Sequence, residues 1–482
     1  MTVATAAAER MSRVDTAWLR MDTEANLMMI VGVWLLTPRL TLAELRERVS
    51  TGLLAYPRFG QKVVEDATGA SWVDDAAFDI ARHVQREVLR RKEGEAPLDA
   101  LKRRVAELAT TPLDPSRPLW HFLLIEGLDS EHSAMVTRIH HCIGDGIALT
   151  SVVLSIADGG KAPPVHVHRG APDPHEDGGD WLTDAVIKPF TEFTVKAIGM
   201  YGKGVGKSME MLAEPGAPLA GSLDVARAGY QILNDVAAFA LMPDDSPTRL
   251  KGTATPGKRV AWGEPLSLAA VKAVGKVLDA SINDVLLSTV AGAVGDYLRS
   301  KGDDPSGQEI RAMVPVNLRP LEQAYQLGNR FGLVPLTLPI GISNPIERLV
   351  AVRARMAELK GSYQPLLAFG LLALSGLMVK PVQSAITSLF AKKATAVMTN
   401  VPGPKEPIRF CGRTVEQVMF WVPQSGDIGM GVSILSYAGG VQFGLITDAR
   451  MCPDPEAIVA RFDPEFDKLV WLALMAPWPG EG

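Results

Sequence analysis

The sequence has little cysteine and no basic cluster. Only 3 of its 482 residues are cysteines, and the formal net charge is −5. Three scattered cysteines give no disulfide framework and suit a reducing cytoplasm. Nucleic-acid-binding proteins concentrate lysine and arginine on one face or stripe, and no basic run dominates this chain. These shortages argue against a disulfide-stabilised secreted scaffold and against a nucleic-acid partner.

Long apolar runs are missing as well. The longest, LLAFGLLALSGLMV at 366–379, has 14 residues, whereas a membrane-spanning helix needs about 20. The N-terminal stretch MTVATAAAERMSRVD brings Glu9 and Arg10 before any apolar core, unlike a signal peptide. With 47% hydrophobic and 21% charged residues, the composition is typical of a soluble globular protein with large cores.

Histidine is confined to the N-terminal third. All eight histidines lie at or before His175, and the remainder of the chain has none. Imidazole is the side chain best suited to exchange a proton near neutral pH. Any chemistry that needs imidazole is therefore predicted to depend on the first third of the chain.

Breaker-rich stretches divide the chain into two parts. Residues 158–180 and 242–259 are rich in Pro, Gly and Asp, which is typical of loops. On either side of them, strand-like and helix-like segments alternate, which predicts an α/β fold. We predict an N-terminal lobe over 1–157, a linker and helical connection over 158–259, and a C-terminal lobe over 260–482, with the active site in the cleft between the lobes.

Local patterns predict individual elements. The strand-like segments are 27–36, 78–89, 119–128, 133–141, 310–320, 333–340, 432–437 and 441–447, and the helix-like segments are 40–54, 98–111, 146–158, 266–278 and 282–300. Thr41 and Glu44 have the spacing of a capping box, which predicts a helix start.

The stretch RIHHCIGDGIAL at 138–149 concentrates reactive side chains. Side chains alternate along a strand, so His140 and His141 are predicted to face opposite sides, one toward the cleft and one bracing the loop. Gly144 and Gly146 allow a sharp turn and close approach of a ligand. Asp145 lies at the expected helix start, where a carboxylate is favoured. A histidine presented in this way can act as a general base on an alcohol, amine or thiol.

Other interpretations of the same stretch are weaker. A histidine near an aspartate is often structural. Adjacent histidines on opposite strand faces make a poor metal chelate, and neither H-E-x-x-H nor C-x-x-C is present. Cys142 is a conceivable nucleophile beside a histidine, but an ordinary buried cysteine is the simpler interpretation.

A second stretch partly resembles a phosphate-binding loop. GKGVGKS at 202–208 has the ending of the motif, but Tyr201 stands where the first glycine is required. The segment before it is not a clear buried strand either. We interpret it as a surface segment and not as a nucleotide site.

The motif HHCIGDG matches HHxxxDG, the signature of the CoA-dependent acyltransferase superfamily, which includes chloramphenicol acetyltransferase and peptide-synthetase condensation domains. The ordered motifs narrow the resemblance: SRVDTAWL (12–19), NLMMI (26–30), RPLW (117–120), IND (282–284), VPVNLRP (314–320), GNRFG (328–332) and TNVPGP (399–404). Together the set resembles the bacterial wax ester synthase/diacylglycerol acyltransferase family over nearly the whole chain.

The resemblance implies two chloramphenicol-acetyltransferase-like lobes and roles for particular residues. The catalytic motif would comprise His140, His141, Asp145 and Gly146. His141 would be the general base, and Asp145 a structural brace. We further predict Arg319 as the partner of Asp145.

In the family's ND motif, Asn283 and Asp284 would support substrate binding. The substrates implied are long-chain acyl-CoA and either a long-chain alcohol or diacylglycerol, joined directly and without a cofactor. The implied location is the cytoplasm, with peripheral contact at the inner face of the plasma membrane or at lipid inclusions.

Two further interpretations stay open. One is an acyltransferase or condensation-type enzyme of the same superfamily with a different acceptor, and the other is a non-catalytic lipid-binding protein of the same fold. The apolar run 366–379 and the helical stretch near 186–243 would suit acyl chains or a membrane surface, with ordinary core as the alternative.

Overall fold

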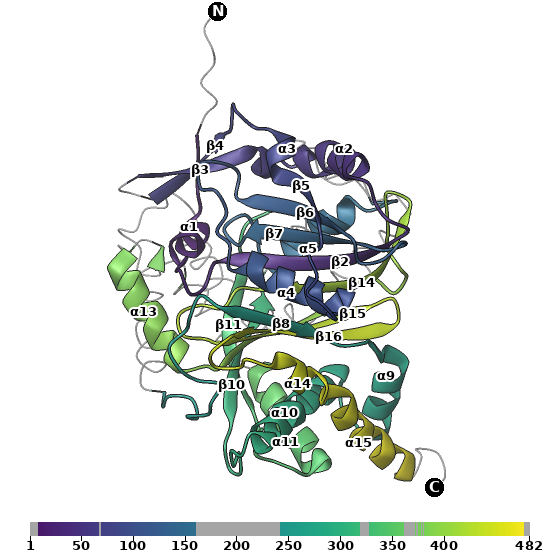
Figure 1. Cartoon of the computed structure of the whole chain (residues 1–482). Helices are drawn as coiled ribbons and strands as arrows, with labels where there is room; N and C mark the ends of the chain where they lie inside the picture. Colours follow the sequence, from purple (N-terminus) through teal and green to yellow (C-terminus); the bar gives the residue numbers. More distant parts are fainter. Residues whose placement is uncertain are drawn as a thin grey trace, which may run out of the picture.

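The computed structural model describes residues 8–66, 69–160, 242–318, 327–360 and 380–476, together with Leu372, Ser375, Gly376 and Met378. Three segments singled out in the sequence fall largely or wholly outside these residues: most of the linker 158–259, the stretch GKGVGKS and the apolar run 366–379. The described residues form mixed α/β structure in which two large sheets are covered by helices (Figure 1).

The first large sheet has six strands in the order β13-β14-β2-β7-β6-β5. Four come from the N-terminal part: β2 (Met29–Thr37), β5 (Val84–Val88), β6 (Trp120–Glu126) and β7 (Ser133–His140). β7 is buried along its whole length and pairs antiparallel with both β2 and β6. The strand that carries the first histidine of the motif therefore lies inside the sheet, where its position is fixed from both sides.

The other two strands of this sheet come from the far end of the chain. β13 (Arg409–Phe410) and β14 (Arg413–Trp421) follow the second half of the sequence, yet β14 pairs antiparallel with β2 from Val31 to Thr37. Two strands from within the predicted C-terminal lobe, 260–482, therefore belong to the sheet of the N-terminal part. This exchange ties the two halves together through main-chain hydrogen bonds.

The second large sheet has seven strands in the order β11-β10-β12-β15-β16-β8, with β9 also paired to β16. Its members are β8 (Lys258–Trp262), β9 (Leu266–Ser267), β10 (Ile310–Asn317), β11 (Phe331–Leu338), β12 (Ala396–Pro402), β15 (Met430–Tyr437) and β16 (Gly440–Asp448). β12 runs parallel to β10 and β15, whereas the other strand pairs described in this sheet are antiparallel.

A small sheet and the helices complete the described structure. The small sheet is β1 (Glu9–Arg10), β4 (Gly69–Asp74) and β3 (Gln61–Asp66). The helices are α1 (Arg13–Arg20), α2 (Leu42–Gly52), α3 (Ile80–His83), α4 (Pro97–Ala109), α5 (Gly146–Ser155), α9 (Leu268–Val277), α10 (Ile282–Ser300), α11 (Pro345–Lys360), α13 (Lys380–Lys392), α14 (Pro455–Val459) and α15 (Phe462–Met475), with short 3₁₀ turns at Leu53–Ala55 and Pro57–Gly60.

Separate apolar cores fill the spaces between these layers. One core joins α1, α2 and α5 to the first sheet, and a second joins α9, α10, α11 and α15 to the second sheet. A third lies between the sheets, where Val105 of α4 belongs to the same cluster as Val260 and Trp421. The two halves therefore share apolar packing as well as strands.

Most of the elements predicted from periodicity are confirmed. The capping box of α2 is present, with Thr41 Oγ1 accepting from the Glu44 N–H and the Glu44 carboxylate accepting from the Thr41 N–H. Among the described residues, no single helix is long and apolar enough to cross a membrane, and α9 and α10 pass that test only as a pair bent by 100°.

Candidate active site

The HHxxxDG motif forms a strand–turn–helix element. β7 ends at His140, His141 begins the turn, and α5 starts at Gly146. Asp145 is the N-cap of α5, and its Oδ1 accepts a hydrogen bond of 2.9 Å from the Ala148 N–H. Both predictions for this segment, the helix after the turn and the carboxylate at its start, are confirmed.

The His141 ring lies between two aromatic side chains. The Trp18 ring stacks on it with centroids 4.2 Å apart and planes 16° apart. The Phe331 ring lies 5.4 Å away at a tilt of 42°. Trp18 belongs to α1 and Phe331 begins β11, so segments from both halves of the chain contact this ring. His141 is only 3% exposed.

Hydrogen bonds hold the His141 backbone rather than its ring. Its N–H donates to the Met28 carbonyl at 2.7 Å, and its carbonyl accepts from Asn329 Nδ2 at 2.7 Å. The ring atom Nδ1 is buried without a hydrogen-bond partner. Among the described residues, none hydrogen-bonds Nε2. The contacts of the described residues therefore fix the His141 backbone and do not engage Nε2.

Burial controls the charge of His141. Desolvation lowers its pKa to about 4, against the opposing effects of Asp145 and Asn329. A histidine with such a pKa is neutral near pH 7 and can accept a proton. The ring is thus in the protonation state that a general base requires.

His140 has different surroundings, as the alternation of side chains predicts. Its Nε2 lies 3.2 Å from Asp22 Oδ2, and its Nδ1 accepts from the Cys142 N–H at 3.1 Å. Burial lowers the pKa of His140, and Cys142 and Asp22 more than offset this and raise it. The rise due to Cys142 requires a thiolate, which burial disfavours. Because the N–H of Cys142 can donate only to an unprotonated Nδ1, we assign the neutral tautomer that donates from Nε2 to Asp22. His140 therefore braces the turn.

Cys142 is unsuited to act as a nucleophile in this setting. The residue is fully buried, and burial raises the pKa of its thiol. A buried, protonated thiol is poorly reactive. The structure therefore supports the simpler interpretation of Cys142 as a core residue.

Asp145 joins the turn to the second half of the chain. Its Oδ2 accepts a hydrogen bond of 3.0 Å from the Arg330 N–H, and its own N–H donates to the Gly328 carbonyl. Gly328 in turn donates to the Ile143 carbonyl. Arg319, the predicted partner of Asp145, lies outside the described residues. The contacts described here pair Asp145 with the backbone of the GNRFG motif.

Replacing Asp145 with alanine is expected to destabilise the protein by about 2–3 kcal/mol, because a helix cap and a hydrogen bond between the halves are lost together. The urea midpoint of unfolding measures the effect. Asp79→Ala is the matched control, since Asp79 caps the short helix α3 with the same kind of bond to Ala81 N. It should cost no more than about 1 kcal/mol, and equal losses for the two variants would contradict the role of Asp145.

Asp284 and Asn283 begin α10, at the other predicted motif. The Asp284 carboxylate completes a capping box by accepting from the Ser281 N–H at 2.9 Å. Asn283 Oδ1 accepts from Asn400 Nδ2 at 2.8 Å. Among the described residues, no hydrogen bond joins either residue to His141. Asp284 thus has a structural task, and a role for the pair in substrate binding stays a prediction.

Four residues at the site had no role assigned from the sequence: Asp15, Trp18, Asn329 and Phe331. Their motifs, SRVDTAWL and GNRFG, were recognised only as part of a resemblance. Their contact with the HHxxxDG turn depends on chain segments more than a hundred residues apart, which periodicity does not reveal. The sequence signal for these contacts is that both motifs occur in the same chain as HHxxxDG.

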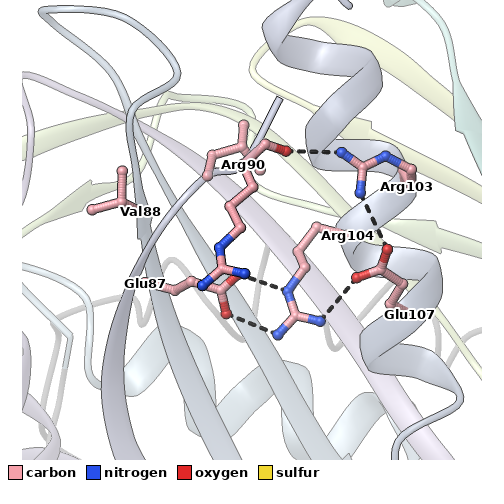
Figure 2. Close-up of a pocket in the computed structure, with 7 residues that line it drawn as sticks. Glu87, Val88, Arg90, Arg103, Arg104 and Glu107 are labelled. Atoms are coloured by element: carbon pink, nitrogen blue, oxygen red, sulfur yellow. Dashed lines mark hydrogen bonds and ion pairs between the residues drawn. The ribbon is translucent and has the colours of Figure 1, made fainter. Parts of the chain in front are cut away.

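A separate surface pocket lies away from these residues, between β5 and α4 (Figure 2). It has a volume of about 840 Å³. Arg104 pairs with Glu87 and Glu107, and Arg103 pairs with Glu107 and Glu95. These guanidinium groups are already neutralised by glutamates. Elsewhere in the described ranges, no group of three or more His, Cys, Asp or Glu residues is arranged to hold a metal.

Solved structures show the fold of this protein. A wax ester synthase/diacylglycerol acyltransferase from Marinobacter aquaeolei VT8 matches with a TM-score of 0.66 at 19% identity, over 96% of this chain and 99% of that one. The first condensation domain of the calcium-dependent antibiotic synthetase matches with a TM-score of 0.59 at 13% identity, over 97% of each chain. The fold is the two-lobed, chloramphenicol-acetyltransferase-like α/β fold, as predicted.

Sequence comparison identifies the family. Residues 11–286 match the wax ester synthase/diacylglycerol acyltransferase catalytic domain, and residues 327–470 match the C-terminal domain of that family. A probable diacylglycerol O-acyltransferase of Mycobacterium tuberculosis is 28% identical over 420 residues, covering 86% of this chain and 84% of the relative. The chain belongs to the wax ester synthase/diacylglycerol acyltransferase family and is an acyltransferase.

Proposed function

We propose that this enzyme transfers a long-chain acyl group from acyl-CoA to the hydroxyl of a diacylglycerol or a long-chain alcohol. The products are triacylglycerol or wax ester and free CoA. The observation that carries the proposal is the buried, neutral ring of His141, which is clamped by Trp18 and Phe331 and has Nε2 unengaged by any described residue.

The reaction needs one proton-accepting group. Nε2 of His141 takes the proton of the acceptor hydroxyl as its oxygen attacks the thioester carbonyl. The tetrahedral intermediate then collapses, the carbon–sulfur bond breaks, and the imidazolium returns the proton to the departing CoA thiolate. The acyl group passes directly to the acceptor, so no acyl-enzyme forms. Acyl-CoA serves as co-substrate, and the step requires no cofactor.

The substrates suggest where the enzyme works. Acyl-CoA is water-soluble at its nucleotide end, whereas diacylglycerols and long-chain alcohols reside in lipid. We therefore propose a cytoplasmic enzyme in peripheral contact with the inner face of the plasma membrane or with lipid inclusions. Co-sedimentation of the purified protein with phospholipid vesicles and co-flotation with a triolein emulsion test this location, and recovery entirely in the lipid-free aqueous fraction in both cases would contradict it.

The pH dependence follows from the lowered pKa of His141. The neutral ring is the active form, and it persists as pH falls until the pKa near 4 is approached. We expect kcat/KM to stay within about twofold between pH 5.5 and 7.5, with the acid limb below pH 5. Initial rates measured at saturating acceptor check this. A limb centred near pH 6.5, in a protein that stays folded, would show that the ring titrates as an ordinary exposed histidine.

Release of CoA thiol from palmitoyl-CoA tests the proposed reaction. The assay is run with 1-hexadecanol, with dioleoylglycerol, with a primary amine, and with no acceptor. Acceptor-dependent release with either hydroxyl lipid supports the proposal and ranks the two substrates. Equal release in the absence of acceptor would indicate thioester hydrolysis instead.

A second candidate is a condensation-type reaction on an amine, which the structural likeness to a condensation domain favours. Release that depends only on the amine would support it and overturn the neutral-lipid proposal. A folded protein that releases no thiol under any condition would favour a non-catalytic lipid-binding role.

A further inference from the structure

We propose that Asn329, held by Asp15, is a positioning residue that fixes which nitrogen of His141 carries the proton. The inference rests on the proposed function, because it concerns the base of that reaction. It assigns the Nδ1–H tautomer to the resting enzyme, with Nε2 unprotonated and directed to the acceptor hydroxyl.

The orientation of the Asn329 amide is determined by its partners. Nδ2 lies 2.7 Å from Asp15 Oδ1 and 2.7 Å from the carbonyl of His141. Both partners are acceptors, so the group between them has to be the NH₂, and both of its hydrogens are used. A flipped amide would place its oxygen against a carboxylate and a carbonyl. The amide oxygen therefore lies on the side of the amide group away from these two acceptors.

With the amide in this orientation, one buried oxygen and one buried ring nitrogen remain to be hydrogen-bonded. Asn329 Oδ1 and His141 Nδ1 are both buried and both without a hydrogen-bond partner. The two residues are already joined through the His141 carbonyl. An unprotonated Nδ1 would leave two acceptors unsatisfied, whereas a protonated Nδ1 can donate to the amide oxygen, the interaction through which Asn329 raises the pKa of the ring against the effect of burial. Satisfaction of both atoms therefore selects the Nδ1–H tautomer.

Asp15 anchors the amide from α1. The carboxylate is buried and also accepts from the Asn329 N–H at 3.1 Å, so it holds both the backbone and the side chain of that residue. Burial raises the pKa of Asp15, against the hydrogen bonds from Asn329 and Ser12 and the charge of Arg58. Helix α1 thus supplies both Trp18, which covers the His141 ring, and Asp15, which orients the ring's neighbour.

The charged and titratable groups around His141 come from several elements. They are Asp145 at the start of α5, His140 and Cys142 in the same turn, Asp15 on α1, and Asp22, which lies against His140. Two neutral acceptors face the ring, the carbonyl of His141 itself and the Asn329 side chain, and of these only the Asn329 oxygen can be replaced by substitution. Its effect is therefore separable from the effect of these charges.

The test combines a tautomer measurement with kinetics. Protein labelled with ¹⁵N-histidine reports the protonated and unprotonated ring nitrogens directly, and the signals missing in His141→Ala identify the residue. In the wild type we expect a protonated Nδ1 and an unprotonated Nε2. In Asn329→Leu we expect a mixture of tautomers and a kcat lowered roughly 10–100-fold, as for a base held in the wrong geometry, with KM for acyl-CoA changed less than about threefold.

Two variants complete the experiment. Asn26→Leu is the matched control, since Asn26 is a buried asparagine that bridges Lys258 and the Gly426 carbonyl without touching His141. It should leave the tautomer unchanged. Asp15→Asn keeps nearly the same volume but replaces the carboxylate with a neutral amide, which weakens both hydrogen bonds that orient Asn329. It should therefore shift the tautomer ratio partly, even if Asn329→Leu fails to fold.

The outcomes distinguish this inference from the proposed function. A single Nδ1–H tautomer in every folded variant, with kcat unaltered, would overturn the positioning role. The nitrogen signals require no turnover, so they test Asn329 even if the enzyme proves inactive on every acceptor. Absence of acyl transfer in the wild type with the expected tautomer would overturn the proposed function alone.

Discussion

His141→Ala is expected to lower kcat for acyl transfer by about 10²–10⁴-fold, the usual contribution of a general base. The substitution removes the one ring that Trp18 and Phe331 clamp at the end of β7. KM for acyl-CoA should change little, because the base acts on the proton of the acceptor in the transition state. Initial-rate measurements of thiol release against both substrates give the two constants.

His132→Ala is the matched control for this loss. His132 also lies in the first third of the chain, but it is partly exposed and pairs with Asp129 and Glu416 at the surface. Its removal should change the rate by no more than about twofold, as for most surface substitutions. A His141→Ala enzyme that is folded and nearly as active as the wild type would remove the base from the proposed reaction.

Arg348→Met is expected to cause the largest loss of stability, about 3 kcal/mol, because it leaves the buried Glu465 carboxylate with only the partly exposed Lys468 as a described ion-pair partner. Arg348 on α11 and Glu465 on α15 are each 1% exposed and lie 2.5 Å apart. Arg348 also donates to the Ser288 carbonyl of α10, so one side chain joins three helices. Urea unfolding followed by circular dichroism measures the change.

Two comparisons show whether the loss comes from the buried Glu465 charge that has lost Arg348. The double variant Arg348→Met, Glu465→Leu should recover much of the stability, since an apolar pair has no desolvation cost. Arg249→Met breaks a partly exposed pair with Asp303 and should cost no more than about 1 kcal/mol. A double variant less stable than the single one would mean that the ion pair itself stabilises the helices.

Local features of the fold were predictable because they depend on neighbours in sequence. The capping box at Thr41 and Glu44 and the cap at Asp145 each involve residues three positions apart. Opposite roles for His140 and His141 follow from the alternation of side chains along β7. These signals need no knowledge of the remainder of the chain.

Long-range pairing was beyond such signals. Nothing in the pattern of β14 indicates that it pairs with β2, nearly four hundred residues earlier, because the apolar residues of the two strands would fit any buried sheet position. The hydrogen bonds from Asn329 to Asp15 and to the His141 carbonyl depend on that same assembly. The sequence could therefore place the candidate base but not the residues that orient it.

The most direct test of the account follows the acyl group itself. Palmitoyl-CoA labelled in the acyl carbonyl is incubated with the enzyme, 1-hexadecanol and dioleoylglycerol, and the extracted lipids are separated by thin-layer chromatography. The account predicts label in wax ester or triacylglycerol with the wild type and its near absence with His141→Ala. Label found only in free palmitate, or equal ester formation by both proteins, would contradict it.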